Sequence, residues 1–428
     1  MRQRQFVADL VSGTQVPRMF RVRQVFPRPR IDPRDIPGII DGLLSQEKFA
    51  SRVRPGMHIA ITAGSRGVAN VALTTKCIAD FCKKQGAKPF VVPAMGSHGG
   101  ATAEGQREIL AGYGIVEEYV GCPIVSSMEV VKIGVNEEGV DVYIDRHAAE
   151  ADGIILGCRI KPHTAFRGPY ESGLMKMMAI GLGKQQGAED IHGQSPAIMH
   201  ELIEEYGRTI LKNAPILGGV AVLENAYDKI CKIQGLTPQE IIDLEPGLRD
   251  ESYTTIARLL FDRCDVLVVD KIGKNISGDG MDPNVTGRFC TQYASGGIQA
   301  EKVVVLDLTD ETHGNAQGVG LADVTTRRLY NKLSMEMTYP TGVTNTFLHL
   351  MKIPMVMDND REAMQLALRS CPEAEDRDHL KLIRIPDTAH IAYIEISEGL
   401  IPAARENPRL EILSEPYDLA FDDQGNLF

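Results

Sequence analysis

Three side chains capable of acid–base or metal chemistry lie in one stretch of the sequence, residues 158–193. His163, Lys176 and His192 are separated there mostly by small or apolar residues, as in GLMKMMAIGLG. Two imidazoles and an amine in a setting rich in Gly, Met and Ala indicate reactive groups held in a tight cavity. A lysine among methionines either extends to solvent or is held away from water, which makes it nucleophilic. We favour the second interpretation for Lys176.

Other polar residues follow predicted strands. Buried segments such as HIAITAG, KPFVVPAM and GIILG alternate with helical patterns, which predicts an α/β fold with mostly parallel sheets. Ligands bind beyond the carboxyl ends of such strands, where loop amides and helix N-termini converge. The polar residues at these places are Arg66, His98, His163, Lys271, Lys274 and His313. We therefore expect one shared site.

Simpler interpretations of the same residues stay open. His98, in the loop GSHGGAT, could only cap the next helix, for which Thr102 is also a suitable N-cap, and His163 could be a turn residue after Pro162. The glycine-rich loops GSHGGATAEG and SGDGMDPNVTG lack the spacings of Walker and dinucleotide motifs, although their amides could hold a phosphate. His192 and His200 are eight residues apart, which does not support a zincin-type metal pair.

The order of predicted elements indicates two α/β domains, residues 1–248 and 249–428, with a cofactor cleft between them. Residues 1–50 contain Pro-rich connections and a helix, and residues 129–145 and 218–236 form two hairpins. The polar segment TPQEIIDLEPGLRDESYTT is the predicted linker, followed by a helix, IARLLFDR, that starts the second domain. This domain is expected to close the substrate cleft.

Composition restricts the class of protein. The net charge of -11 and the absence of a Lys/Arg cluster argue against a nucleic-acid partner. No run of about 18 apolar residues is present, so we expect no membrane partner, and a large acidic chain with scattered cysteines is expected in the cytoplasm. Self-association is left open.

Three blocks of the sequence, GSHGGATAEGQREIL, KPHTAFRGPYESGLMK and IHG, resemble the lactate racemase family that uses the nickel-pincer nucleotide. The resemblance implies that His98 and His163 are the catalytic acid/bases. It also implies that Lys176 is joined to the cofactor and that His192, sixteen residues later, ligates nickel. Cofactor contacts are expected from Arg66, Ser97, Gly99 and Thr102, and substrate contacts from Arg66, Lys271, Lys274, Arg167 and Tyr170.

The activity that the resemblance implies is inversion of the α-carbon of a 2-hydroxy acid by reversible hydride transfer to the cofactor. Two opposed histidines suit a reaction that must act on both faces of a planar keto acid. The implied partners are a small 2-hydroxy acid and the proteins that make the cofactor. Material from a host without those proteins is expected to lack it.

Two departures from the family favour a substrate other than lactate. The strand-end motif has Ala63 where the family has an acidic residue, and the segment TAFRGPYESG adds residues before Lys176. Trp is also absent. We expect a larger or more polar acid, such as a sugar acid or a dicarboxylate. The alternatives are a metal-dependent lyase or hydrolase that uses the same histidines, and a nucleotide-binding protein without catalysis.

Overall fold

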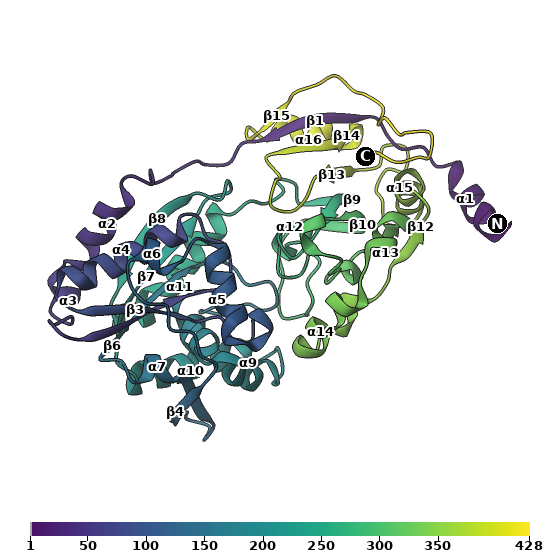
Figure 1. Cartoon of the computed structure of the whole chain (residues 1–428). Helices are drawn as coiled ribbons and strands as arrows, with labels where there is room; N and C mark the ends of the chain where they lie inside the picture. Colours follow the sequence, from purple (N-terminus) through teal and green to yellow (C-terminus); the bar gives the residue numbers. More distant parts are fainter. Residues whose placement is uncertain (1) are drawn as a thin grey trace. The chain divides into compact units, whose positions relative to one another are not determined.

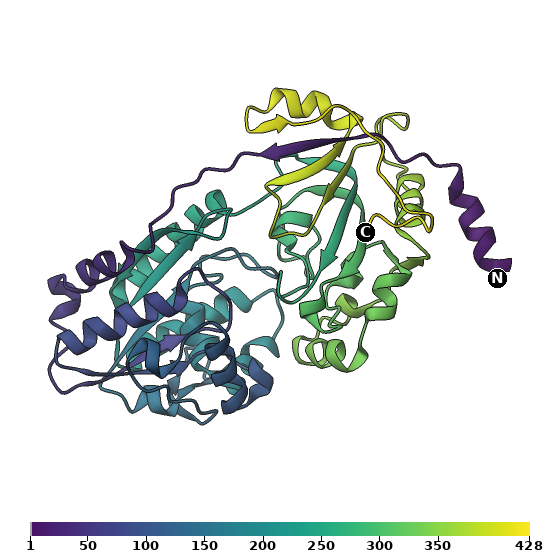
Figure 2. The ribbon, with the colours of Figure 1, turned by 45° about the horizontal axis from the view of Figure 1, so that its top comes forward.

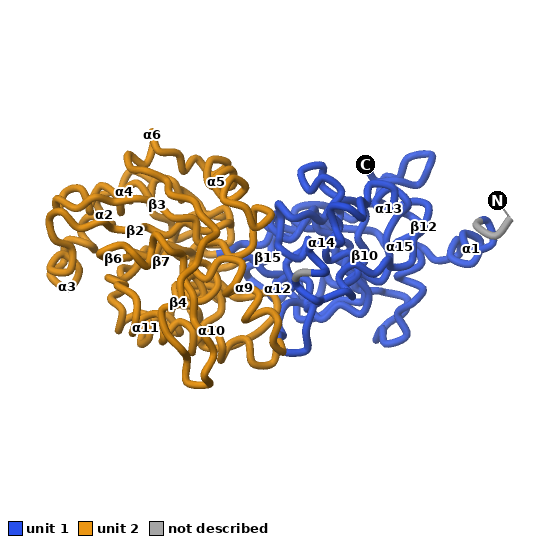
Figure 3. The backbone as a smooth tube through the Cα atoms, turned by 60° about the horizontal axis from the view of Figure 1, so that its bottom comes forward, with its two compact units in different colours: residues 1–26, 257–428 blue, residues 27–256 orange. Residues whose placement is uncertain are grey.

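The structure is a computed structural model that describes residues 2–428. Its backbone contacts divide into two compact units, residues 27–256 and residues 1–26 with 257–428 (Figure 3). Each unit contains a mixed sheet whose larger part is parallel, which confirms the predicted α/β class. In the described chain, no helix is both long and apolar enough to span a bilayer.

The unit of residues 27–256 contains a five-stranded sheet in the order β3-β2-β6-β7-β8. All neighbouring strands are parallel except β7 and β8, which form the predicted antiparallel hairpin. The separate hairpin β4–β5 is also as predicted. The strands of this unit are β2 (His58–Ala63), β3 (Lys88–Pro93), β4 (Val130–Val135), β5 (Asp141–Asp145), β6 (Gly153–Arg159), β7 (Ile216–Glu224) and β8 (Ile230–Leu236).

Helices cover both faces of this sheet (Figure 1). They are α2 (Ile36–Leu44), α3 (Glu47–Ala50), α4 (Val71–Lys84), α5 (Ala103–Gly112), α6 (Glu117–Val120), α7 (Arg146–Ala149), α8 (Leu174–Lys176), α9 (Lys184–His192), α10 (Met199–Asn213) and α11 (Pro238–Thr255). Side chains alternate between the faces of a strand. Ile59 and Ile61 of β2 therefore belong to the core under α2 and α4, whereas Ala60 belongs to the core under α8–α11.

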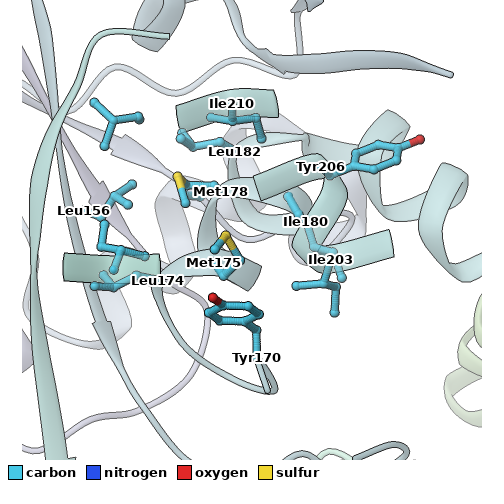
Figure 4. Close-up of a cluster of buried hydrophobic side chains, with 14 of the residues drawn as sticks. Leu156, Tyr170, Leu174, Met175, Met178, Ile180, Leu182, Ile203, Tyr206 and Ile210 are labelled. Atoms are coloured by element: carbon cyan, nitrogen blue, oxygen red, sulfur yellow. The ribbon is translucent and has the colours of Figure 1, made fainter. Parts of the chain in front are cut away.

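The second core surrounds the segment that carries Lys176. Met175 and Met178 on this segment pack with Ile203 and Ile210 of α10 (Figure 4). A π-helical turn, Met177–Leu182, joins α8 to α9. Because Leu174, Met175 and Met178 are buried, the backbone around Lys176 is held by a packed core even though Lys176 is only partly buried itself.

The other unit contains an eight-stranded sheet in the order β12-β11-β10-β9-β13-β14-β1-β15, in which the pairs from β12 to β13 are parallel and the rest antiparallel. Its strands are β1 (Met19–Gln24), β9 (Arg263–Ile272), β10 (Gln299–Leu308), β11 (Val324–Thr326), β12 (Met355–Met357), β13 (Leu382–Ile385), β14 (Tyr393–Ser397) and β15 (Leu410–Ile412). Its helices are α1 (Arg2–Ser12), α12 (Pro283–Thr286), α13 (Arg327–Lys332), α14 (Met335–Asn345), α15 (Asp360–Arg369) and α16 (Ile401–Glu406).

Three features differ from the sequence-based expectations. The predicted linker is helix α11, which starts at a capping box formed by Thr237 and Glu240 and contains position 248, the predicted domain boundary. The predicted helix IARLLFDR is not a helix, because Leu259 and Phe261 are buried at the alternate spacing of an extended chain. Residues 1–26 group with the C-terminal residues, since β1 pairs with β14 and β15 (Figure 2).

Candidate active site at the carboxyl edge of the five-stranded sheet

The strand order β3-β2-β6 brings three predicted site segments to one edge of the sheet. His98 follows β3, Arg66 follows β2 and His163 follows β6, and the three strands are parallel neighbours. The carboxyl ends of parallel strands lie at the same edge, which is where open α/β sheets bind ligands. The structure thus brings these three residues to the same edge, as the sequence predicted.

The loops of His98 and Arg66 are joined directly. The Ser65 hydroxyl and His98 Nδ1 are hydrogen-bonded. Gln106, which is buried in α5, donates to the carbonyl oxygens of Gly96 at 2.8 Å and His98 at 3.2 Å. The His98 side chain is exposed while its backbone is fixed, an arrangement that suits a group acting on a bound molecule.

His163 lies directly against Lys176. Its Nε2 is 2.5 Å from Lys176 Nζ, its Nδ1 accepts the N–H of Ala165 at 3.1 Å, and its ring stacks on Phe166 with centroids 4.2 Å apart. Desolvation, followed by the charge of Lys176, lowers the pKa of His163 well below its ordinary value. The imidazole is therefore neutral at pH 7 and able to accept a proton.

His192 ends helix α9 and is partly buried. Burial, with a smaller contribution from Lys176, lowers the pKa of His192 to about 4. A neutral imidazole is a good nitrogen donor to nickel. Among residues 2–428, no group of three or more His, Cys, Asp or Glu side chains is placed to hold a metal.

The segment between His163 and Lys176 contributes less to the site surface than the sequence suggested. Tyr170 is buried in the apolar core and donates its hydroxyl to the carbonyl oxygen of Ile242 at 2.8 Å, which argues against the predicted contact with a substrate. Arg167 donates to the carbonyl oxygen of His163 at 2.6 Å. Its guanidinium thus helps to fix the turn that carries His163.

The predicted cofactor contacts Ser97, Gly99 and Thr102 lie in the loop before α5. Thr102 is the N-cap of α5: its hydroxyl accepts the N–H of Gly105 at 3.1 Å and donates to Gly99 O at 3.0 Å. Gly99 has φ +68, and a Cβ there would lie 2.6 Å from the nitrogen of Gln106. This loop therefore requires glycine for its own packing, and the Thr102 hydroxyl is engaged by the helix.

Three predicted residues, Lys271, Lys274 and His313, belong to the other unit, at the carboxyl ends of the parallel neighbours β9 and β10. Lys274 donates from Nζ to the carbonyl oxygen of Gly278 at 2.7 Å and to the side chain of Gln317. Lys271 Nζ lies 5.6 Å from the ring centroid of Phe428. The structure brings the two lysines and His313 to one sheet edge of this unit.

The sequence did not predict that helix α11 contributes a buried polar group beside this site. Glu171, Glu245, Arg249 and Tyr253 connect α11 to the segment that carries His163 and Lys176. The sequence does contain a sign of this helix. The capping sequence Thr237-Pro-Gln-Glu240 marks a helix start where we expected a linker.

Two comparisons with known proteins found a match, one by sequence and one by fold. Residues 24–201 match the family model described as the lactate racemase N-terminal domain. The structure of the lactate racemase apoprotein from Thermoanaerobacterium thermosaccharolyticum is similar in fold, with a TM-score of 0.53 and 15% sequence identity over 86% of this chain and 94% of that chain. No curated protein matches the sequence. The matched residues 24–201 include His98, His163, Lys176 and His192, so the part of the chain that carries the predicted catalytic and cofactor centre is similar to the lactate racemase N-terminal domain.

Proposed function

We propose that the protein is a racemase or epimerase that inverts the α-carbon of a 2-hydroxy acid. The observation that carries the proposal is the contact of 2.5 Å between His163 Nε2 and Lys176 Nζ, beside a neutral His192, in a lactate racemase N-terminal domain. A nucleophilic amine, an acid/base and a metal ligand are the groups that a tethered metal cofactor and its substrate require.

The donor set fits a nickel-pincer nucleotide. Lys176 would hold the group covalently and His192 would give nickel one neutral nitrogen, while the cofactor would bring the remaining ligands that the protein lacks. When bound, this cofactor supplies an acceptor for the hydrogen at the substrate α-carbon. Proteins that make the cofactor are then required partners in the cell.

The remaining steps belong to residues of the chain. His98 and His163 would each hold or release the proton of the substrate hydroxyl, since burial keeps His163 neutral at pH 7 and His98 is exposed at the same sheet edge. We assign Arg66, at the sheet edge that carries His98 and His163, to the substrate carboxylate or the cofactor phosphate. The added segment before Lys176 is the reason to test acids larger or more polar than lactate beside lactate itself.

The two alternative functions make different predictions. A hydrolase or lyase with a protein-bound zinc needs several protein ligands together, and none are grouped in this way among the residues that the structure describes. A nucleotide-binding protein without catalysis would keep its ligand affinity in His98→Ala and His163→Ala variants. The proposed racemase would lose turnover in both variants while keeping nickel.

The test is an intact-mass spectrum and a nickel measurement on full-length protein from a host that makes the cofactor. We expect a nucleotide-sized increment on Lys176, with nickel lost in His192→Ala and kept in the control His379→Ala, an exposed histidine paired with Asp376. Racemisation of a panel of hydroxy acids then identifies the substrate. An unmodified, nickel-free wild-type chain from such a host would contradict the proposal.

A further inference from the structure

One face of helix α11 carries three polar side chains at intervals of four residues. Glu245, Arg249 and Tyr253 lie at i, i+4 and i+8, which places them on the same side of the helix. All three contact the segment between β6 and the π-helical turn: Glu245 contacts Met175, and the other two contact Glu171. The polar groups of this face therefore point toward the reacting groups rather than to solvent.

The first contact of this face is with Glu171, whose side chain is fully buried. Its Oε1 accepts hydrogen bonds from Arg249 at 3.0 Å and the Tyr253 hydroxyl at 2.8 Å. Its Oε2 accepts the backbone N–H of His163 at 2.7 Å. A buried carboxylate needs this degree of compensation, so the position of His163 depends on donors from α11.

The second contact is made by Glu245 itself, which is also buried. Its carboxyl accepts the N–H of Met175 at 3.1 Å, in the short helix that ends at Lys176. A Cβ at Gly173 would lie 2.0 Å from Glu245 Oε1, so the close approach requires glycine at this position. The backbone beside Lys176 is thus fixed to α11 as well.

Glu171 fixes the backbone of His163 and Glu245 fixes the backbone beside Lys176. The side chains of these two residues are in contact, with Lys176 Nζ 2.5 Å from His163 Nε2. We propose that Glu245, Arg249 and Tyr253 are positioning residues: with Glu171, they set the distance between the His163 ring and the Lys176 amine. The proposal builds on the proposed function, in which this pair attaches the cofactor and moves a proton. Its contacts belong to the protein alone, so it can be tested without cofactor.

The experiment records the ring ¹⁵N spectrum of His163 in the full-length, cofactor-free protein, with the resonance assigned from His163→Gln. The wild type should show the two widely separated nitrogen signals of a single neutral tautomer. Tyr253→Phe removes only the hydroxyl that Glu171 accepts, and should move both signals toward an average. The matched control is Tyr143→Phe, which removes a hydroxyl that donates to Asp141 at 3.2 Å on the hairpin β4–β5.

The Glu245 anchor is tested by a pair of variants. Glu245→Ala should shift the Nε2 signal through Lys176, whereas Glu245→Gln keeps an oxygen acceptor for Met175 and should restore the wild-type spectrum. Unchanged His163 signals in both Tyr253→Phe and Glu245→Ala, with only a lower melting temperature, would overturn the proposal and leave α11 a purely structural helix. If Glu245→Ala does not fold, Tyr253→Phe alone decides, since it preserves the ring and its packing. Failure of the nickel test with these shifts present would count against the function and not against the positioning.

Discussion

Glu245 should make the stability of the sheet unit of residues 27–256 depend on pH. Its carboxyl is buried, with no cationic partner among the residues that the structure describes, and desolvation raises its pKa from 4.5 to about 8. The folded protein therefore keeps a proton that the unfolded chain releases near pH 4.5. Stability from this group is complete below pH 4.5 and is lost as the pH rises to about 8. Glu245→Gln removes the titration but keeps a hydrogen-bond acceptor.

The expected magnitude follows from the pKa of 4.5 in the unfolded chain and about 8 in the folded protein. At about 1.4 kcal/mol per pH unit, the wild type should lose about 3.5 kcal/mol relative to Glu245→Gln between pH 5 and pH 8. The assay is urea unfolding at both pH values, followed by pulsed hydrogen exchange of β6 and β7 peptides so that this unit is observed by itself.

The control is Glu240→Gln on the same helix. Glu240 belongs to the capping box and pairs with Lys48, and although burial opposes it, its hydrogen bonds lower its pKa below 4.5. It stays ionised in both states from pH 5 to pH 8, so the stability difference between wild type and Glu240→Gln should not change over that range. If the difference for Glu245→Gln were equally constant, the reasoning about the buried carboxyl would be refuted.

Three further predictions concern the surroundings of the site. Thr102→Ala removes the N-cap of α5 and should cost about 1 kcal/mol, measured as a lower melting temperature, whereas Thr102→Ser should not. Lys184→Met leaves Asp145 without its buried ion pair and should cost about 3–5 kcal/mol in urea unfolding, part of which Lys184→Met with Asp145→Asn should recover. Burial raises the pKa of Cys82 to about 12 and that of Cys122 to about 11. Both thiols should therefore resist iodoacetamide at pH 8 until the protein is unfolded, as followed by peptide mass spectrometry.

The sheet edge could be predicted because its signals are local. Buried apolar runs such as His58–Ala63 and Lys88–Pro93 are followed within a few residues by polar groups, and parallel pairing places their ends together. The N-cap at Thr102 is likewise a signal within one turn of helix. These features gave the α/β class and the positions of Arg66 and His98 relative to the strands.

The missed features depend on contacts between distant parts of the chain. Tyr253 reaches Glu171 across 82 residues of sequence, and Pro246 inside α11 favoured the interpretation as a linker. Strand β1 pairs with Tyr393–Ser397 near the other end of the chain, and nothing local specifies that partner. Sequence patterns left the type of α11 ambiguous and could not specify its partners, which follow from packing.

In the loop that carries Arg66, the missing acidic residue at position 63 is partly replaced by a carboxylate from another strand. Ala63 stands where the family has an acidic residue, but Glu224, at the end of β7, accepts the N–H of Ala69 at 2.6 Å and pairs with Arg159. A carboxylate thus anchors this loop from another strand, and its charge is compensated by Arg159. The change at position 63 is therefore weak evidence for a new substrate. The segment before Lys176 is no stronger evidence, because Tyr170 is buried in the core, Glu171 is fully buried and Arg167 contacts the turn of His163.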